Sequence, residues 1–232
     1  MFLPIGDDQI KGGAKPIFAY AFIGVNVLIF LYQSSLGAEG YGGFLREFGS
    51  IPAEIQSGQD LFTLITNMFL HGDFMHLAGN MLMLWIFGDN IESTIGSLNF
   101  VLFYVMGGVI ATICHALSDF DSITPAVGAS GAIAACLGAY LVMFPKSQIK
   151  ILVFYLFRSF KVPAIYFLGF WILKELGSGL GIFGGGGNIA YWAHIGGFGF
   201  GALAGYLAKQ VYPVNDDMTL GDPTIQPRKD YI

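Results

Sequence analysis

The chain has 232 residues, of which 54% are hydrophobic and 12% are charged, and its formal net charge is −5. An average soluble domain carries about 25% charged residues, so this chain has too few of them to cover a surface that faces water. The composition excludes a soluble globular domain, a disordered protein and a nucleic-acid-binding protein, which would need a basic surface, and it predicts a polytopic membrane protein.

Six stretches of the chain predict transmembrane helices, each of which needs about 20 mostly apolar residues. We expect a cytoplasmic tail over residues 1–15, spans over about 16–36, 74–92, 97–117, 129–145, 162–178 and 188–208, and a polar tail over 211–232. The second span is weaker because Asp73 and Asp89 bound its apolar run. The fifth is long enough only if Lys174 and Glu175 lie near a membrane face.

Two connecting segments stand out between these spans. Residues 39–72 predict a long first outer loop, in which Leu61–Leu70 is apolar enough to enter the membrane interface. The chain breakers in that loop are Gly42, Gly43, Pro52 and Gly58. A second loop is expected at the glycine-rich run Gly177–Gly187, before the last span.

The basic residues predict the orientation of the spans. With six spans, both termini and the loop 146–161 share one side, and most of the 11 Lys and Arg residues fall there, whereas the opposite loops hold Arg46 alone. Because cytoplasmic loops are rich in Lys and Arg, we expect both termini to be cytoplasmic. The N-terminus shows neither a removable signal peptide nor a transit peptide, which favours the plasma membrane of a prokaryote.

A polar side chain inside a predicted span is costly without a partner or a function, and four of those in this chain bear on the argument: His76, Asn80, Ser130 and His194. His76 and Asn80 are four residues apart and therefore share one helix face. Ser130 begins the fourth span from its outer side, where free backbone N–H groups and the positive end of the helix dipole lie. His194 is about two turns from the outer end of the last span, at a depth similar to that of Ser130.

Small residues indicate that the fourth and sixth spans pack closely. Gly197, Gly201 and Gly205 recur every four residues, and Gly131 and Gly138 provide small residues on the fourth span. Such packing would bring a serine hydroxyl beside a neutral imidazole, which is a nucleophile with its base. Donors on the second span would then be able to stabilise an oxyanion.

Each of these patterns also has a structural explanation. A Gly-Ala-Ser-Gly segment is often a packing motif, and a single histidine in a span is more often a hydrogen-bonded structural residue. We also expect structural roles for His71, which precedes a loop, and for His115, at the outer end of the third span. Cys114 and Cys136 lie in apolar runs and are expected to be small buried hydrophobes rather than a disulfide or metal ligands. Spacing alone supports a serine hydrolase and a proton-path transporter equally.

Taken together, these motifs resemble the rhomboid family of intramembrane serine proteases, over about residues 61–206. In chain order they are Thr66-Asn67-Met68-Phe69-Leu70-His71, His76-Leu77-Ala78-Gly79-Asn80, Gly88 with Glu92 and Gly96, Gly128-Ala129-Ser130-Gly131, and Ala193-His194-Ile195-Gly196-Gly197. Their order on these spans is highly specific. The loop departs from the family pattern, because Phe62-Thr63 stands where many members carry Trp-Arg.

The resemblance implies an all-α bundle of six transmembrane helices over residues 16–210, with a partly membrane-embedded first outer loop and an active site in a water-filled cavity below the outer surface. It implies that Ser130 is the nucleophile and His194 the general base and acid, in a dyad without an acidic third member. The sequence shows no unpaired Asp or Glu at the depth of His194, which agrees with a dyad. His76 and Asn80 would bind the oxyanion together with the Ser130 N–H.

The family also implies structural roles for Glu92, Gly128, Gly131, Gly197 and Gly201, with Glu92 tying the inner end of the second span to the following loop. The fifth helix and the loop after it would gate substrate entry. We expect single-span membrane proteins as substrates, contact with membrane lipid, and no metal, organic cofactor, nucleic acid or obligate protein partner. The alternatives are a catalytically inactive rhomboid-like protein that binds membrane clients and, less favoured, a proton-coupled transporter.

Overall fold

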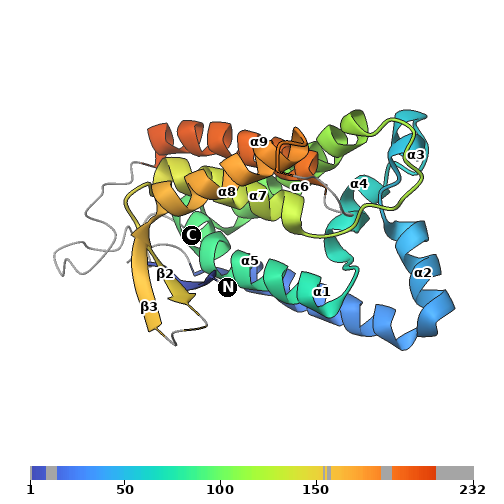
Figure 1. The fold of residues 1–232 in the computed structure, drawn as a ribbon, viewed down its shortest axis with the longest axis horizontal. Helices are drawn as coiled ribbons and strands as arrows, with labels where there is room; N and C mark the ends of the chain where they lie inside the picture. The colour runs from blue at the N-terminus through green and yellow to red at the C-terminus, as the bar shows by residue number, and fades with distance from the viewer. Residues whose placement is uncertain (1, 9–14, 154, 156–157, 184–189, 213–232) are drawn as a thin grey trace.

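The computed structural model describes residues 2–8, 15–153, 155, 158–183 and 190–212. Within these residues, six helices of at least 14 residues run side by side along the long axis of the molecule (Figure 1). They are α1 (Ile17–Ser35), α5 (Phe74–Ile95), α6 (Ser97–Ser118), α7 (Ser130–Met143), α8 (Ala164–Gly179) and α9 (Tyr191–Val211). The expectation of a mostly helical protein is confirmed. By length and composition, α1 and α6 are able to cross a membrane on their own.

The bundle exposes many large apolar side chains on its outside and buries several polar ones among the apolar residues of its core. Leu28 on α1 is 67% exposed, and large apolar side chains are exposed along α6, α8 and α9 as well. Asn26 and Gln33 on α1, by contrast, are fully buried and hydrogen-bonded to backbone, Asn26 to the carbonyl of Phe22 and Gln33 to that of His71. A surface that faces lipid needs this distribution, because an unpaired polar group is costly in hydrocarbon.

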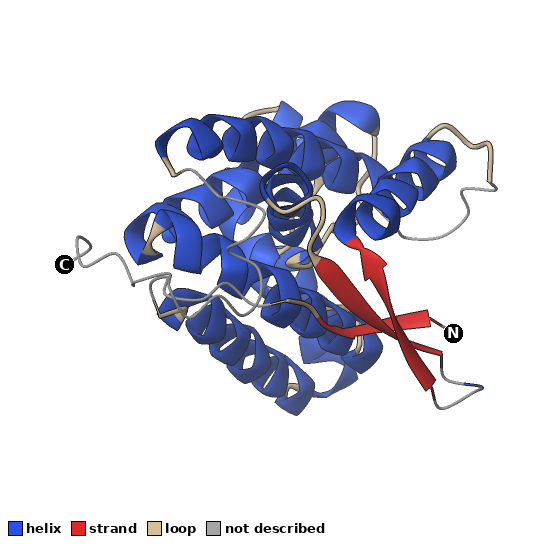
Figure 2. Cartoon of the chain, turned by 90° about the vertical axis from the view of Figure 1, so that its left-hand side faces the viewer, coloured by secondary structure: helices blue, strands red, loops and turns tan. Residues whose placement is uncertain are grey.

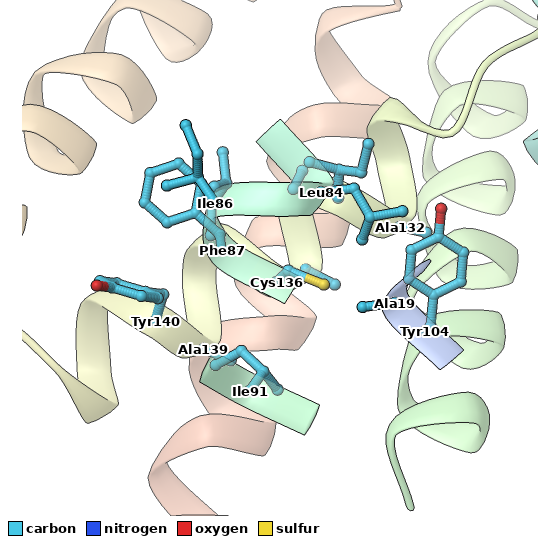
Figure 3. Packing of buried hydrophobic residues seen from close by; sticks show 14 of the residues in the cluster. Ala19, Leu84, Ile86, Phe87, Ile91, Tyr104, Ala132, Cys136, Ala139 and Tyr140 are labelled. Atoms are coloured by element: carbon cyan, nitrogen blue, oxygen red, sulfur yellow. The ribbon is translucent and has the colours of Figure 1, made fainter. Parts of the chain in front are cut away.

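The centre of the bundle is α7, whose small residues let the neighbouring helices approach closely. Figure 3 shows Ala132, Cys136 and Ala139 of α7 among buried side chains of α1, α5 and α6. On the α9 side the two backbones are nearly in contact, since a Cβ on Gly201 would lie only 1.9 Å from the carbonyl oxygen of Ala135. Cys136 is a buried free thiol.

The segment expected as the outer loop consists of short helices at one end of the molecule: α2 (Gly37–Phe48), α3 (Pro52–Gln56), α4 (Thr63–Thr66) and the 3₁₀-helix η1 (Asn67–Phe69) (Figure 1). Contrary to expectation, α2 continues through Gly42 and Gly43. Its side chains pack on the rest of the chain: the ring of Phe44 contacts Tyr32 of α1, and Tyr41 donates to the carbonyl of His71. Tertiary contacts therefore outweigh the low helix propensity of glycine.

A small antiparallel sheet, which the sequence analysis did not predict, lies at the opposite end of the bundle (Figures 1 and 2). Within the described residues it has three strands in the order β1 (Phe2–Gly6), β2 (Gln148–Val153) and β3 (Arg158–Pro163). Leu3 pairs with Leu152, and Ile151 pairs with Phe160. The segment expected as an N-terminal tail is thus joined to the loop between α7 and α8.

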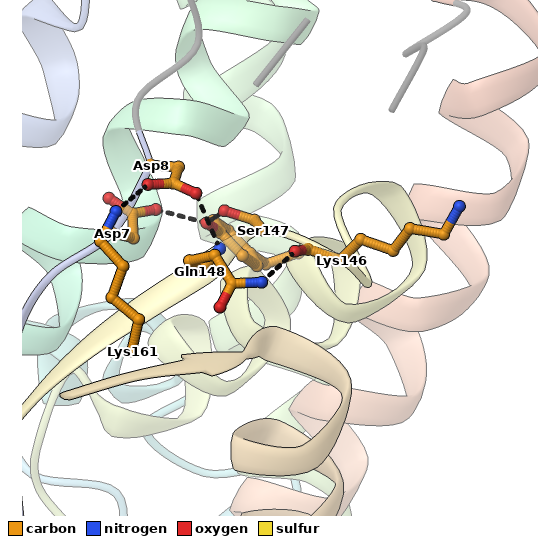
Figure 4. Close-up of polar contacts among 7 residues, drawn as sticks. Asp7, Asp8, Lys146, Ser147, Gln148 and Lys161 are labelled. Carbon is orange, nitrogen blue, oxygen red and sulfur yellow. Dashed lines mark hydrogen bonds and ion pairs between the residues drawn. The ribbon is translucent and has the colours of Figure 1, made fainter. Parts of the chain in front are cut away.

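Acidic side chains fix this sheet to the ends of the helices. Asp8 accepts from Lys161 Nζ of β3 (3.2 Å) and from the backbone N–H of Gln148 in β2 (3.1 Å) (Figure 4). Asp7 accepts from Asn90 at the end of α5 and from Tyr140 of α7. The residues after β1 therefore hold the ends of two helices and two strands together.

Glu92 joins three helices at the same end of the bundle. Its carboxylate accepts from the backbone N–H groups of Phe18 (3.0 Å) and Ala19 (2.7 Å), in the first turn of α1, and from the hydroxyl of Ser97 (2.6 Å), at the start of α6. Pro16, the residue before α1, makes no side-chain cap. Glu92 thus caps α1 from a distance, in addition to contacting the segment that follows α5.

Candidate active site

Ser130 and His194 lie within hydrogen-bonding distance of each other, each in the first turn of its helix. Ser130 is the first residue of α7, and its hydroxyl donates to Nε2 of His194, which lies one turn into α9, over 2.9 Å. Next to this pair the two helices pack through glycines. A Cβ on Gly197 would lie only 2.2 Å from the carbonyl oxygen of Gly131, so the two backbones are nearly in contact. This close approach positions the imidazole beside the hydroxyl.

His76 and Asn80 converge on the backbone just before Ser130. A Cβ built on Gly128 would lie 2.8 Å from Nε2 of His76 and 3.5 Å from Nδ2 of Asn80, so both side chains of α5 point at this glycine. Gly128 has a φ of +129°, which side-chain-bearing residues rarely adopt. The position therefore needs glycine both for its backbone conformation and for the space that the two donors occupy.

The contacts of these two side chains indicate which atoms donate toward Gly128. The N–H of Gly72 donates to His76 Nδ1 over a long 3.5 Å, which leaves the ring proton on Nε2. Asn80 Nδ2 donates to Nε2 of the fully buried His71 (2.9 Å) and keeps its second proton free for the site. His71, expected to be structural, thus orients Asn80. Its place in the Thr66–His71 motif was a signal for that role.

Glu175 is the residue that the sequence analysis missed. Its Oε2 accepts from Nδ1 of His194 at 2.7 Å, its Oε1 binds Lys174 Nζ at 2.8 Å, and the residue is only 3% exposed. The expectation that no acid lies at the depth of His194 is therefore wrong. Glu175 was expected near a membrane face together with Lys174. Instead α8 continues for another turn, to Gly179, and Glu175 points inward.

A cavity of about 750 Å³ opens between α5 and α8 and reaches Ser130 and His194. Its wall on the α5 side includes His76 and Asn80, and its wall on the α8 side consists of aromatic residues and Lys174. At the inner end it is bounded by residues of the sheet, among them Pro4 and Ile151. The cavity is mostly apolar, and its polar groups gather around the Ser130 hydroxyl.

The glycine-rich segment before α9 is only partly described. Gly177 and Gly179 belong to α8, which corrects the expectation that the loop begins at Gly177. A turn follows, in which Gly181 has a φ of +75°. The remaining part, residues 184–187, lies outside the described residues. Among the residues that the structure describes, no group of three or more His, Cys, Asp or Glu side chains is arranged to hold a metal ion.

The apolar surface, the helical bundle and the serine–histidine pair facing a lateral cavity define a helical membrane protein with a serine-based site. Residues 58–211 match the family model of the Rhomboid domain, and the chain therefore belongs to the rhomboid family. The resemblance stated from the motifs is confirmed, and the match includes Ser130, His194, His76 and Asn80.

Curated relatives come from bacteria and from eukaryotic organelles. The chain is 36% identical to "Rhomboid protease GluP" of Bacillus subtilis over 127 residues, which cover 55% of this chain and 24% of that protein. It is 30% identical to "Rhomboid protein 1, mitochondrial" of Saccharomyces cerevisiae over 201 residues, 83% of this chain and 54% of that protein. A zebrafish relative, "Presenilin-associated rhomboid-like protein A, mitochondrial", is 32% identical over 109 residues, 46% of this chain and 28% of that protein. The chain spans about half, or less, of the length of these relatives.

Proposed function

We propose that this protein is an intramembrane serine endopeptidase that cleaves single-span membrane proteins within or near their transmembrane segments. The observation that carries the proposal is the 2.9 Å contact between Ser130 Oγ and His194 Nε2, on the wall of a cavity inside a bundle with an apolar surface. The six long helices would cross the plasma membrane of a prokaryote, with both termini and the sheet on the cytoplasmic side.

The cavity supports a lateral route for the substrate. Its rim carries Met75 of α5 and Tyr166 and Phe170 of α8, all well exposed on the apolar surface. A substrate helix would enter between α5 and α8 from the lipid. Its cleavage site would have to unwind, and the polar groups of the cavity would satisfy the backbone groups that unwinding exposes.

The site geometry supports acyl transfer. Ser130 Oγ would attack the substrate carbonyl carbon while its proton passes to His194 Nε2. The tetrahedral oxyanion would be held by Nε2–H of His76, Nδ2–H of Asn80 and the N–H of Ser130, and such donors are worth about 2.7–4 kcal/mol each. The C–N bond then breaks as His194 returns the proton to the leaving amine. Water, with His194 as base, would hydrolyse the acyl-enzyme, releasing the acid and restoring Ser130.

The test combines a probe with a substrate. The purified protein is reacted with a fluorophosphonate, the adduct is located by mass spectrometry, and single-span fusion proteins in liposomes are assayed for cleavage. We expect a label on Ser130 that is absent in Ser130→Ala and in His194→Ala, and cleavage that both variants abolish while their melting temperatures stay near that of the unaltered protein. Cleavage by Ser130→Ala would contradict the proposal. A folded, unaltered protein without a label would favour a client-binding protein or a transporter.

A further inference from the structure

The imidazole of His194 is held on both sides. Nε2 faces Ser130 at 2.9 Å, and Nδ1 faces the carboxylate of Glu175 at 2.7 Å. The three residues come from α7, α9 and α8, so the line of contacts crosses three helices. Because Nδ1–H donates to the carboxylate, Nε2 is left with its lone pair toward the serine hydroxyl, which is the tautomer that a general base requires.

The position of Glu175 on α8 argues against an incidental contact. The buried face of α8 includes Ala164, Leu168, Glu175 and Ser178, at successive spacings of about one or two turns. Trp171, on the same face, lies with its ring 5.8 Å from that of His194. A carboxylate on such a face loses most of its hydration, and this cost requires compensation by specific partners.

The titratable groups near the pair lie on α5, α6 and α8. Lys174 binds the other oxygen of Glu175 and is 51% exposed toward the cavity. His76 of α5 and His115 of α6 are close enough to His194 to interact with it electrostatically. With Lys174 bound to Oε1, Oε2 remains directed at Nδ1 of His194.

We infer that Glu175 is a positioning residue that completes a Ser130–His194–Glu175 triad, an inference that rests on the proposed protease function. Glu175 does not touch the substrate. It fixes the ring orientation and the Nδ1–H tautomer of His194, and it offsets the positive charge that the ring acquires when it takes the Ser130 proton. That proton stays on His194 until the leaving amine accepts it, and Glu175 remains ionised throughout.

The experiment measures how fast a fluorophosphonate labels Ser130 as a function of probe concentration, which separates the maximal labelling rate from the probe affinity. In Glu175→Gln the amide would keep the volume but lose the charge and the tautomer preference. We expect the maximal rate to fall by about 10²–10⁴-fold, as for loss of the acid in a serine triad, with the probe affinity and the melting temperature nearly unchanged. Glu175→Asp should recover part of the rate.

Two variants separate this role from a structural one. Glu92→Gln alters another buried glutamate, whose partners are Phe18, Ala19 and Ser97, and should lower the melting temperature without lowering the labelling rate of the folded fraction. Lys174→Met removes the cation but leaves Glu175 in contact with His194, and should cost much less than Glu175→Gln.

The outcomes distinguish the inference from the function on which it rests. If the unaltered protein is labelled at Ser130 and Glu175→Gln is labelled at the same maximal rate, the triad is overturned and the protease function stands. If Glu175→Gln loses labelling only in proportion to its unfolded fraction, the triad is also overturned. If the folded, unaltered protein is not labelled at all, both are overturned.

Discussion

At the scale of single residues, the site depends on a glycine as much as on its polar groups. Gly128 has a backbone conformation that disfavours side chains, and the space where its Cβ would lie is taken by His76 and Asn80. Ser130, the nucleophile of the proposed mechanism, lies two residues further along the chain. A single methyl group at Gly128 would therefore displace the side chains of His76 and Asn80 without removing any polar atom.

We predict that Gly128→Ala destabilises the protein by about 1–3 kcal/mol through backbone strain and nearly abolishes labelling of Ser130. The control is Gly58→Ala in the outer segment, which also has a positive φ, +74°, but has nothing within 4 Å of the added Cβ. It should lose comparable stability and keep its labelling rate. Equal labelling of the two variants, measured on folded protein, would contradict this account.

A site residue can be predicted from the sequence when its signal is local, and cannot when its role arises only from the packing of helices. Ser130, His194, His76 and Asn80 are recognisable because each is polar within an apolar run and belongs to a motif. Glu175 is not, because it follows Lys174 at the end of a short apolar run, where charged residues normally mark a membrane face. Its role appears only when α8 packs on α9, and that packing depends on residues distant in sequence.

At the scale of helices, the contact between α7 and α9 sets the position of His194. Their backbones approach so closely that the added Cβ of Gly201 would overlap the carbonyl of Ala135. In lipid, where apolar surface gives little drive for helix association, such close packing is a main source of stability. The glycine spacing in α9 predicts a contact face, although it does not by itself identify the partner helix.

We predict that Gly201→Ala lowers the free energy of unfolding by about 1–3 kcal/mol, because the helices must separate to admit the methyl group. Gly199→Ala on the same helix is the matched control, since its Cβ would have nothing within 4 Å. Thermal melting in detergent checks both variants. Similar melting temperatures for the two would show that the close contact does not limit stability.

The cap that Glu92 provides for α1 gives a second prediction at this scale. Glu92→Ala would leave the N–H groups of Phe18 and Ala19 without their acceptor, one of them in a buried position. We expect a loss of about 3 kcal/mol, since bonds to a charged acceptor contribute about 1.5–3 kcal/mol each. Equilibrium unfolding measures it. Glu92 does not cap α1 if the melting temperature of Glu92→Ala is unchanged and hydrogen exchange at the start of α1 stays slow in this variant.

The helices were predictable because absence of charge over about 20 residues is a local property of the chain. The strand β1 was not, because it pairs with β2 across most of the chain, Leu3 with Leu152, and no local pattern records so distant a partner. The helix α2 was missed for a related reason. Its glycines signal a break, whereas contacts from Tyr41 and Phe44 to other segments stabilise the helix.

At the scale of the whole molecule, stability should depend on pH through Asp7 at the sheet end. Burial, with the nearby charges of Asp89 and Asp8, raises the pKa of Asp7 to about 8, although hydrogen bonds from Tyr140 and Asn90 oppose the shift. A free carboxyl has a pKa near 3.8. Between these values the folded state binds more protons than the unfolded state, so its stability falls as the pH rises.

We therefore predict that the melting temperature in detergent decreases steadily from pH 5 to pH 8 and that Asp7→Asn, which mimics the protonated form, flattens this dependence. Asp121→Asn, an exposed change in the segment between α6 and α7, is the control and should keep the slope. A melting temperature that rises across this range in the unaltered protein would show that Asp7 does not dominate the pH dependence.

The pairing of β1 with β2 also has a consequence for how the protein is made. A ribosome completes β1 first, yet its partner strand emerges only after α1, α5, α6 and α7 have been synthesised. Closing so long a loop is slow compared with forming local helices. The strand β1 must therefore wait without its partner strand, and Asp7 and Asp8 reach Tyr140 and Lys161 only after α7 and β3 have been synthesised. All three strands have been synthesised before α8 and α9, so the sheet can close the inner end of the cavity before the helices that complete its walls and carry His194 have been made.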